Sequence, residues 1–392
     1  MKADAAGVPA SPLRAALVAG ETSGDLLAAE LLRAMAQRWP GLEAGGIGGP
    51  HMQARGFQAW WPSEKLAVRG YVEVLRHYRE IIGIRNQLRE RLLQHKPDVF
   101  IGVDAPDFNL DLEGDLKQAG IKTVHFVAPA VWAWRPERVE KIRRCVDHVL
   151  CIFPFEPELL ANHGIRATYV GHPLAQVIPE QPDRQAARAA LQLPDEAKVV
   201  ALLPGSRRAE IVHLLPRFLQ AARLMLQRQS GLRFVLPAVP AQFGAINAQV
   251  QAAGLELQVQ VTRGASHTAL AACDVTLIAS GTATLEAALF KRPMVIAYHM
   301  NVLSWWLHKR KMLQPWVGLP NILAQEFLVP ELLQGAATPQ ALADATLAWL
   351  ADDAANQQRV HNLQQRFTAM HQELKRDTAR LATDAIQEVL AS

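Results

Sequence analysis

Short apolar runs alternate with longer amphipathic stretches along most of the chain. Apolar runs bounded by glycine or proline are typical of buried strands, and apolar positions at three- to four-residue spacing are typical of helices. The predicted strands are 15–19, 44–49, 98–103, 121–127, 149–153 and 167–170 in the first half, and 199–203, 233–236, 257–261, 275–278 and 294–297 in the second. This alternation predicts an α/β fold with parallel sheets, in which ligands bind at the carboxyl ends of the strands.

A chain of 392 residues is long enough for two domains of ordinary size, and several prolines between the halves indicate a hinge. We expect a Rossmann-like domain at 13–173, a linker at 174–184 and a second Rossmann-like domain at 185–352, with the active site in the cleft between the domains. A disordered extension is expected at 1–12 and helices at 353–392. The helices carry an apolar seam that predicts a partner surface, formed by Val360, Leu363, Phe367, Met370, Leu374 and Leu381.

The composition is that of a packed globular protein, with half of the residues hydrophobic and a fifth charged. The net charge of +4 is small, so basic groups matter by their position. Cys145, Cys151 and Cys273 form no CxxC pair, which argues against a disulfide framework or a zinc site and fits a reducing cytoplasm. Residues 1–14 lack the apolar segment of an export signal, and no run approaches the ~18 apolar residues of a membrane span.

Small residues follow the predicted strand 275–278 and lead into a helix: Ser280, Gly281 and Thr282. A helix that starts at such a turn directs unpaired N–H groups outward, which is a common seat for phosphate. Glu286 falls about one turn into this helix, where a carboxylate could bind two sugar hydroxyls. The pattern indicates a nucleotide site. The competing interpretation is an ordinary βα turn in which Glu286 complements the helix dipole.

Asp104 stands directly after the predicted strand 98–103, where a doubly wound fold places functional groups. A partly desolvated carboxylate at this position could accept the proton of a hydroxyl nucleophile. The alternative is that Asp104 and Asp107 cap the helix predicted to begin near Asn109, a role that fits Asp107 better.

Ser206 and Arg207 follow a predicted strand in the same topological position as Gly281. Arginine at this position could bind a diphosphate through two hydrogen bonds, and the alternative is a solvated surface arginine, which we expect of Arg208. The histidines have no metal-ligand spacing. We expect them to be structural or hydrogen-bonded, including His125, His172 and His299.

Two stretches combine basic residues with apolar or aromatic ones, as proteins at an anionic membrane surface do. Residues 66–96 include seven Lys or Arg and three Glu. The expected membrane or acyl-chain contacts are Leu66, Val68, Arg69, Val72, Leu75, Trp305 and Trp306. The alternative for most of the long helix is a core-facing stripe with a solvated basic face. No nucleic-acid-binding motif accompanies these residues, so we expect no nucleic-acid partner.

Several motifs together resemble the lipid-A-disaccharide synthase family. They are GETSGD at 20–25, VDAPDFN at 103–109, VWAWR at 131–135, LPGSR at 203–207, ASGTA at 279–283 with Glu286, and LPN at 319–321. The resemblance runs from about residue 15 to the last helix. It implies a GT-B fold, with two Rossmann-like domains facing each other across a cleft. In that family the C-terminal helices cross back to the first domain and can exchange between the protomers of a homodimer.

The resemblance implies an inverting, metal-independent hexosyltransferase of lipid A biosynthesis that uses no cofactor. Its substrates would be UDP-2,3-diacylglucosamine and 2,3-diacylglucosamine 1-phosphate (lipid X). Its products would be the β-1,6 lipid A disaccharide 1-phosphate and UDP. The enzyme would be cytoplasmic and peripheral on the inner face of the inner membrane, in contact with its surface lipids.

The resemblance also implies residue roles. Asp104 would be the general base, Ser206, Arg207 and the turn 280–282 would hold the diphosphate, Glu286 would bind the ribose, and Asn321 would complete the nucleotide site. A loop near the cleft would contain Gly20, Glu21, Ser23, Gly24 and Asp25. Arg69 departs from the apolar residue that we expect of the family, although its charged end can extend to lipid phosphates.

Two other functions stay open at this point. One is a different two-domain sugar-nucleotide enzyme, such as a UDP-sugar epimerase or a transferase that acts on polyprenyl carriers. The other is a non-catalytic protein that binds a membrane surface through its Trp and basic residues. Product analysis separates the first from the lipid A activity, and calorimetry with UDP separates the second.

Overall fold

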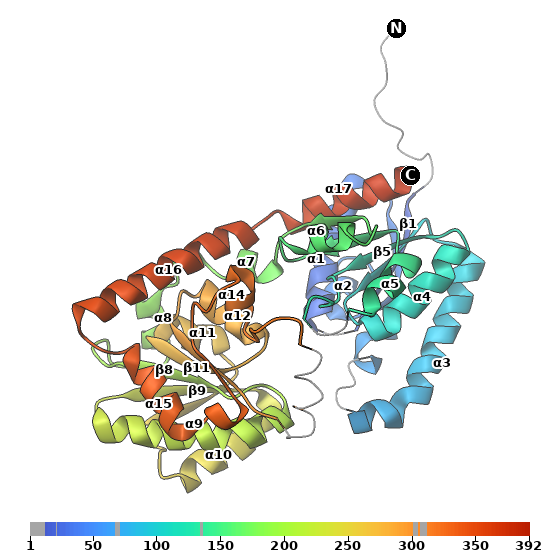
Figure 1. Ribbon diagram of the computed structural model, residues 1–392. Coiled ribbons are helices and arrows are strands. Elements are labelled where there is room, and N and C mark those ends of the chain that lie inside the picture. Colours follow the sequence, from blue (N-terminus) through green and yellow to red (C-terminus); the bar gives the residue numbers. More distant parts are fainter. Residues whose placement is uncertain (1–11, 21, 67–70, 134–135, 301–304, 306–311) are drawn as a thin grey trace. The chain divides into compact units, whose positions relative to one another are not determined.

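The computed structural model describes the chain except for residues 1–11, 21, 67–70, 134–135, 301–304 and 306–311. The extension expected at 1–12 therefore lies almost entirely outside the described residues. The chain forms two compact units, Met1–Pro173 with Leu374–Ser392, and Leu174–Glu373. Each unit contains a parallel sheet with helices packed on it, so the predicted two-domain α/β fold is confirmed (Figure 1). Among the described helices, none combines the length and the apolar character needed to cross a membrane.

The first unit is built on seven parallel strands in the order β3-β2-β1-β4-β5-β6-β7. Their bounds are β1 Arg14–Ala19, β2 Glu43–Gly48, β3 Gln58–Pro62, β4 Val99–Val103, β5 Lys122–Phe126, β6 His148–Cys151 and β7 Ala167–Tyr169. The sequence did not predict β3, because this edge strand is half-exposed and has no buried apolar run. The other six strands of this sheet, among them the largely buried central strands β4 and β5, were predicted from the apolar pattern.

Both faces of this sheet are covered, and β1 shows how. Ala15, Leu17 and Ala19 belong to one core cluster, whereas Ala16 and Val18 belong to another, because successive side chains of a strand point to opposite faces. The helices of the unit are α1 Thr22–Arg38, α2 Pro50–Gln53, α3 Tyr71–His95, α4 Pro106–Gln118, α5 Arg138–Cys145, α6 Glu156–Ala161 and α17 Thr378–Ala391, with the 3₁₀ turn η1 Ser63–Lys65.

The second unit is built on six parallel strands in the order β10-β9-β8-β11-β12-β13. Their bounds are β8 Val199–Leu203, β9 Arg233–Ala238, β10 Val259–Arg263, β11 Val275–Ala279, β12 Met294–Tyr298 and β13 Glu331–Leu333. The helices are α7 Pro173–Val177, α8 Arg184–Ala190, α9 Arg208–Arg228, α10 Phe243–Ala252, α11 Ser266–Ala272, α12 Thr282–Leu289, α14 Leu319–Ala324, α15 Pro339–Ala348 and α16 Ala354–Leu374, with the 3₁₀ turns η2 Pro240–Gln242 and η3 Gln334–Ala336. The expected linker thus contains α7 and the start of α8.

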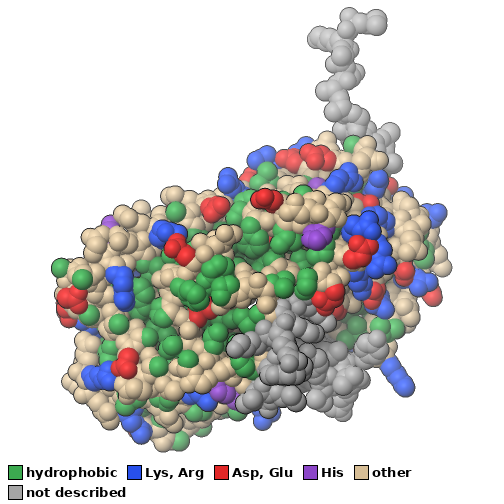
Figure 2. Space-filling model, in the orientation of Figure 1, with side chains coloured by type: hydrophobic (Ala, Val, Ile, Leu, Met, Phe, Trp, Pro, Cys, Tyr) green, Lys and Arg blue, Asp and Glu red, His purple; other side chains and the backbone are tan. Residues whose placement is uncertain are grey.

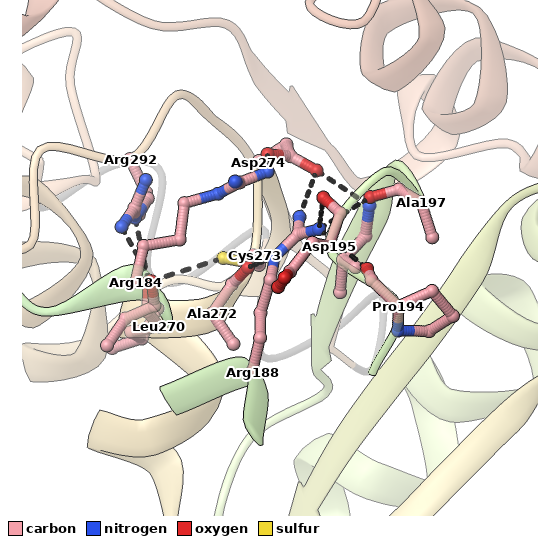
Figure 3. Close-up of polar contacts among 12 residues, drawn as sticks. Arg184, Arg188, Pro194, Asp195, Ala197, Leu270, Ala272, Cys273, Asp274 and Arg292 are labelled. Atoms are coloured by element: carbon pink, nitrogen blue, oxygen red, sulfur yellow. Dashed lines mark hydrogen bonds and ion pairs between the residues drawn. The ribbon is translucent and has the colours of Figure 1, made fainter. Parts of the chain in front are cut away.

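A buried arginine fixes the amino ends of β8 and β11 in this unit (Figure 3). The fully buried Arg188 donates to Asp274 Oδ2 over 2.9 Å, and its other nitrogens donate to the carbonyls of Pro194, Asp195, Ala197 and Ala272. Asp274 also accepts from Arg184 and from the Val199 N–H. The charge is fully hydrogen-bonded, which makes its burial tolerable. The network holds the start of β11, the strand whose other end leads to Ser280.

The two C-terminal helices differ from the expectation, which placed both on the first domain or on a partner protomer. Up to Glu373, α16 belongs to the second unit, and the chain returns to the first unit from Leu374. His371 explains the position of α16, because its Nε2 lies 2.8 Å from Ala175 O and its Nδ1 lies 2.6 Å from Lys291 Nζ. Of the apolar seam residues on α16, Leu363, Phe367, Met370 and Leu374 are buried, whereas Val360 is half-buried.

Only the last helix, α17, packs on the first unit. Its Ile386 and Val389 belong to the same core cluster as Leu17. At the surface, Arg38 of α1 donates to Gln387 over 2.6 Å and forms an ion pair with Asp384. The apolar contacts bury α17, so they dominate over the exposed ion pair.

Candidate functional site

Asp104 occupies a left-handed turn at the carboxyl end of β4. Its φ is +53° and that of Ala105 is +45°, values that residues with a side chain adopt at a cost. Both polar backbone groups of Asp104 are fixed: its N–H donates to Phe126 O over 2.8 Å, and its C=O accepts from Asn109 Nδ2 over 2.7 Å. The expected acid therefore stands at a rigid strand end.

The structure does not assign the N-cap of α4 to either of the two aspartates considered for it. α4 begins at Pro106, three residues before the predicted start, and Ala105 occupies the N-cap position. Asp107 lies within the first turn and forms an ion pair with Arg138. Its charge complements the helix dipole, so Asp107 supports α4 without being the cap residue.

The loop after β1 lies beside the Asp104 turn. A Cβ atom added to Gly20 would stand 3.5 Å from the Cβ of Ala105, and one added to Gly24 would stand 3.8 Å from Val103 O. Ser23 is exposed in the first turn of α1, whereas Glu21 lies outside the described residues. The structure thus brings the predicted loop and Asp104 together within the first unit.

Asp25 of the same motif has a structural role. Its carboxylate is buried and accepts the N–H groups of Gly49, His51 and Met52 at 2.9, 3.0 and 3.1 Å. It therefore anchors the start of α2 to α1, and its position near the loop after β1 follows from this anchoring rather than from exposure to a ligand.

The motif at 131–135 contributes a buried acid. Trp132 Nε1 donates to Glu156 Oε1 over 3.0 Å, and the N–H groups of Ile152 and Phe153 donate to Oε2. Burial raises the pKa of Glu156 to about 7. Phe153 also packs on His172 with ring centroids 5.4 Å apart, and burial lowers the pKa of His172 to about 4. Residues 134–135 of the motif lie outside the described part.

In the second unit, the small-residue turn after β11 has the geometry that the sequence predicts. Gly281 is the N-cap of α12 with φ +152°, and a Cβ atom added there would meet nothing within 4 Å. Ser280 Oγ donates to Val317 O over 2.7 Å, which fixes the turn. The helix begins at Thr282 and faces open space at Gly281, which leaves room for a ligand close to the backbone.

Glu286 lies one turn into α12 and is held by a residue that the sequence did not single out. Its Oε2 is 3.2 Å from Nε2 of His267 on α11, and its side chain is 19% exposed. His267 is itself packed on Phe290, with ring centroids 5.3 Å apart. The carboxylate is therefore oriented and partly accessible, as a hydrogen-bond acceptor for sugar hydroxyls must be.

Arg207 is the N-cap of α9, directly after β8. Its side chain is 70% exposed, and its Nη1 lies 3.2 Å from Glu210 Oε1. The other oxygen of Glu210 accepts the N–H groups of Ser206 and Arg207 at 3.1 and 3.2 Å. Glu210 thus closes the turn as a capping-box acid, a role that its position three residues after Arg207 could have predicted.

The Arg207 and Ser280 turns are neighbours. β8 pairs with β11, with Leu203 opposite Ile278, so both turns leave the same edge of the sheet. Tyr298 ends the next strand, and burial, with the negative charge of Glu210, raises its pKa. One arginine, a helix start and an oriented carboxylate therefore follow the carboxyl ends of the adjacent strands β8 and β11, the usual ligand position in such a sheet.

Asn321 does not fit the expected direct contact with a nucleotide. It is fully buried, and its Nδ2 donates to Val329 O and Glu331 Oε1 at 2.9 and 2.8 Å. Its Oδ1 accepts the N–H groups of Leu328 and Val329. These four bonds use the whole amide. Asn321 therefore supports the loop between α14 and β13.

The expected membrane contacts are described only in part. Val68, Arg69 and Trp306 lie outside the described residues, as do the side chains of Val72 and Leu75. Leu66 is half-buried against the core of the first unit, and Trp305 packs on Tyr298 with ring centroids 6.1 Å apart. Both described side chains contact the protein itself.

The basic residues of α3 are also partly paired. Arg85 and Arg89 form ion pairs with Asp111 and Asp115 of α4 at 2.6 and 3.4 Å, and Arg91 lies over the ring of Trp60. Figure 2 shows basic and acidic side chains intermixed on the first unit. This part of α3 fits the alternative of an ion-paired, solvated face. His125 and His299 are hydrogen-bonded as expected, to Glu113 and Arg217.

The sequence model of the family described as lipid-A-disaccharide synthetase matches residues 15–386. The chain belongs to this family. A relative from Albidiferax ferrireducens, named lipid-A-disaccharide synthase, is 66% identical over 379 residues, which cover 96% of this chain and 97% of the relative. A relative of the same name from Verminephrobacter eiseniae is 61% identical over 382 residues, which cover 97% and 98%. The resemblance seen in the motifs is thus confirmed.

Solved structures agree on the fold. The glycotransferase of kitacinnamycin has a TM-score of 0.61 at 18% identity and covers 96% of this chain and 99% of its own. UDP-GlcNAc 2-epimerase from Neisseria meningitidis, solved with UDP-GlcNAc, has a TM-score of 0.63 at 11% identity and covers 97% and 100%. The chain therefore has the fold of GT-B glycosyltransferases, which it shares with sugar-nucleotide epimerases. The fold alone does not separate these activities.

Proposed function

We propose that this member of the family joins UDP-2,3-diacylglucosamine to lipid X, forming the β-1,6 lipid A disaccharide 1-phosphate and UDP. The observation that carries the proposal is the family match over 15–386, within which the motif residues occupy the strand ends of both sheets. Asp104 lies at the end of β4, and Arg207, Ser280 and Glu286 follow β8 and β11.

The first unit would serve the acceptor. Asp104 takes the proton of the acceptor hydroxyl while the hydroxyl oxygen attacks the anomeric carbon of the donor. The bond from that carbon to the UDP oxygen breaks as the new glycosidic bond forms, so the configuration inverts. A carboxylate fixed at a strand end is suited to this task, because the base must be aligned before the proton moves.

The second unit would hold the donor. Arg207, Ser206 and the helix start at 280–282 bind the diphosphate, and Glu286 binds the ribose hydroxyls. As UDP departs, negative charge develops on its terminal phosphate. The guanidinium and the outward N–H groups stabilise this charge, the task that a metal ion performs in other sugar transferases. Tyr298, Glu210 and Asn321 support this site from its periphery.

Both substrates carry acyl chains, so we place the enzyme in the cytoplasm, on the inner face of the inner membrane. The stretch around Leu66 would meet surface lipids and acyl chains, with Trp305 as a second contact. We further propose a homodimer in which the C-terminal helices can exchange. The membrane assignment depends on the substrates of the reaction, and the homodimer depends on the family resemblance.

The test is an assay with both diacylated sugars. The purified chain is expected to release UDP only when donor and acceptor are both present, and mass spectrometry is expected to detect the disaccharide 1-phosphate. UDP release without an acceptor, or isomerisation of the donor sugar without transfer, would contradict the proposal. Binding to anionic vesicles without affinity for UDP would also contradict it.

A further inference from the structure

A fully buried polar group of three residues lies beneath the Asp104 turn. Asn109 and Glu113 stand four positions apart on α4 and therefore share a face of the helix. His125 lies on β5, opposite Gly102 of β4. All three side chains are closed to solvent, and a Cβ atom added to Gly102 would collide with Glu113. The polar face of α4 is thus in close contact with the sheet at Gly102, two residues before Asp104.

These three residues close a frame around the backbone of Asp104. The N–H of Asp104 donates to Phe126 O on β5, and its C=O accepts from Asn109 Nδ2 on α4. The link between α4 and β5 is the 2.8 Å bond between Glu113 Oε1 and His125 Nδ1. His125 is adjacent to Phe126 in the chain, and Glu113 is one turn from Asn109. The Glu113–His125 bond therefore joins the two groups that hold Asp104.

Packing alone does not explain this frame. Elsewhere α4 buries apolar residues against the sheet, among them Phe108, Leu112 and Leu116. A buried acid–base pair is commonly no more stabilising than apolar residues of the same volume. Moreover, three of its atoms have no hydrogen-bond partner among the described residues: Asn109 Oδ1, Glu113 Oε2 and His125 Nε2. Buried polar atoms of this kind call for a reason other than stability.

The backbone of Asp104 supplies that reason. Two successive residues with side chains adopt positive φ, and such strain persists only where the surroundings over-determine it. We propose that Asn109, Glu113 and His125 are positioning residues that hold the Asp104 turn in this strained form, so that its carboxylate meets the acceptor hydroxyl. The inference rests on the proposed function of Asp104.

The test compares variants that keep the volume but alter the bonds. Asn109→Leu removes the donor to Asp104 C=O, and the double variant Glu113→Leu/His125→Leu removes the link while keeping the interior filled. In the two-substrate assay we expect kcat to fall about 30-fold in each, with the KM for the donor and the Kd for UDP within about twofold of wild type. Glu113→Gln keeps an acceptor for His125, so its kcat is expected to stay within about threefold of the wild-type value. Asp115→Asn, at the surface of the same helix, is the matched control.

The outcomes are separable. If the wild-type chain makes no disaccharide, the proposed function fails. If the wild type is active and both Asn109→Leu and the double variant keep kcat, only the positioning role is overturned. Thermal unfolding monitors the fold of each variant. Should the double variant not fold, Asn109→Leu together with Asn109→Ala decides the question, since a folded variant with unchanged kcat refutes the role.

Discussion

The Oε2 atom of Glu286 lies 3.2 Å from Nε2 of His267, so the acid assigned to the ribose is held by a side chain of the neighbouring helix. Glu286 lies beyond the first turn of α12, and a glutamate that served only the helix dipole would not need this partner. The contact with His267 instead fixes Oε2 of Glu286 in position. The carboxylate, which is partly exposed, is thereby held in one orientation in which it can accept hydrogen bonds from a ligand. This arrangement favours the nucleotide interpretation over that of an ordinary βα turn.

Glu286→Ala is expected to abolish the discrimination between UDP and 2′-deoxy-UDP. A hydrogen bond from a hydroxyl to a carboxylate contributes about 1.5–3 kcal/mol, so wild type should prefer UDP by roughly 10- to 100-fold. Calorimetric titration of both nucleotides measures this ratio, which should approach one in the variant. Glu256→Ala, an exposed acid of the same unit, is the control and should keep the preference. A preference retained in Glu286→Ala would place the ribose elsewhere.

His267→Ala is expected to lower UDP affinity about threefold to tenfold, because the carboxylate of Glu286 loses its restraint. The same change made in Glu286→Ala should have little further effect, since the two side chains act on one ligand group. A double-mutant cycle by calorimetry tests this coupling. Additive losses would show that His267 acts independently of Glu286.

Arg207→Ala is expected to weaken UDP binding about 10- to 100-fold, because a charge-assisted contact with the diphosphate is lost. Uridine, which lacks the phosphates, should bind wild type and variant alike. The neighbouring exposed Arg208 offers a matched control, and Arg208→Ala should leave the Kd for UDP within about twofold. Equal losses in the two variants would indicate a diffuse electrostatic effect instead of a specific clamp.

The sequence predicted the parts of the fold that depend on local pattern. The buried strands β1, β4, β8 and β11 were visible as apolar runs, and the turns at Asp104, Arg207 and Gly281 followed from their topological position. By contrast, β3 and β13 are short and half-exposed, so no apolar run marked them.

Contacts between residues far apart in the chain could not be predicted from the sequence. The buried Arg188 is satisfied by carbonyls and by Asp274, 86 positions away, and no spacing rule connects them. The motif predicted that Asn321 lies in the nucleotide site, yet its side-chain amide forms all of its hydrogen bonds with the segment that follows it. The partners of Glu286 and Asp104, His267 and Asn109, likewise became evident only from the packing of helices. Motifs indicate which residues belong to a candidate site. The contacts in the structure then show whether such a residue is available to a ligand or supports a neighbouring residue that is.

Asp104→Asn is expected to lower kcat about 100- to 10,000-fold while UDP still binds with the wild-type Kd. The amide cannot take up the proton of the acceptor hydroxyl, whereas the proposed donor site belongs to the other unit. The two-substrate assay measures the loss of kcat, and calorimetry measures whether the Kd for UDP is unchanged. Asp107→Asn removes an acid from the same turn that pairs with Arg138, and it should keep kcat within about threefold. An equal loss of kcat in the two variants would show that the Asp104 carboxylate has no special role in the proton transfer.

The buried Glu156 and His172 should make the stability of the first unit depend on pH in opposite directions. Burial raises the pKa of Glu156 to about 7, so the folded state holds this proton more tightly than the unfolded state. Its favourable contribution is complete below about pH 4.5 and is lost as the pH rises through 7. Burial lowers the pKa of His172 to about 4, so its contribution is complete above about pH 6.5 and is lost as the pH falls toward 4.

Glu156→Gln separates the two effects because it removes only the alkaline loss. Between pH 5 and pH 8, the free energy of unfolding of wild type relative to this variant should decrease by about 2–3 kcal/mol, from about 1.4 kcal/mol per unit of pKa shift. Urea unfolding at several pH values measures the difference. Glu158→Gln, an exposed acid of the same helix, should show no such trend. A pH-independent difference between wild type and Glu156→Gln would mean that Glu156 is ionised throughout this range, held by the Trp132 indole and the N–H groups of Ile152 and Phe153.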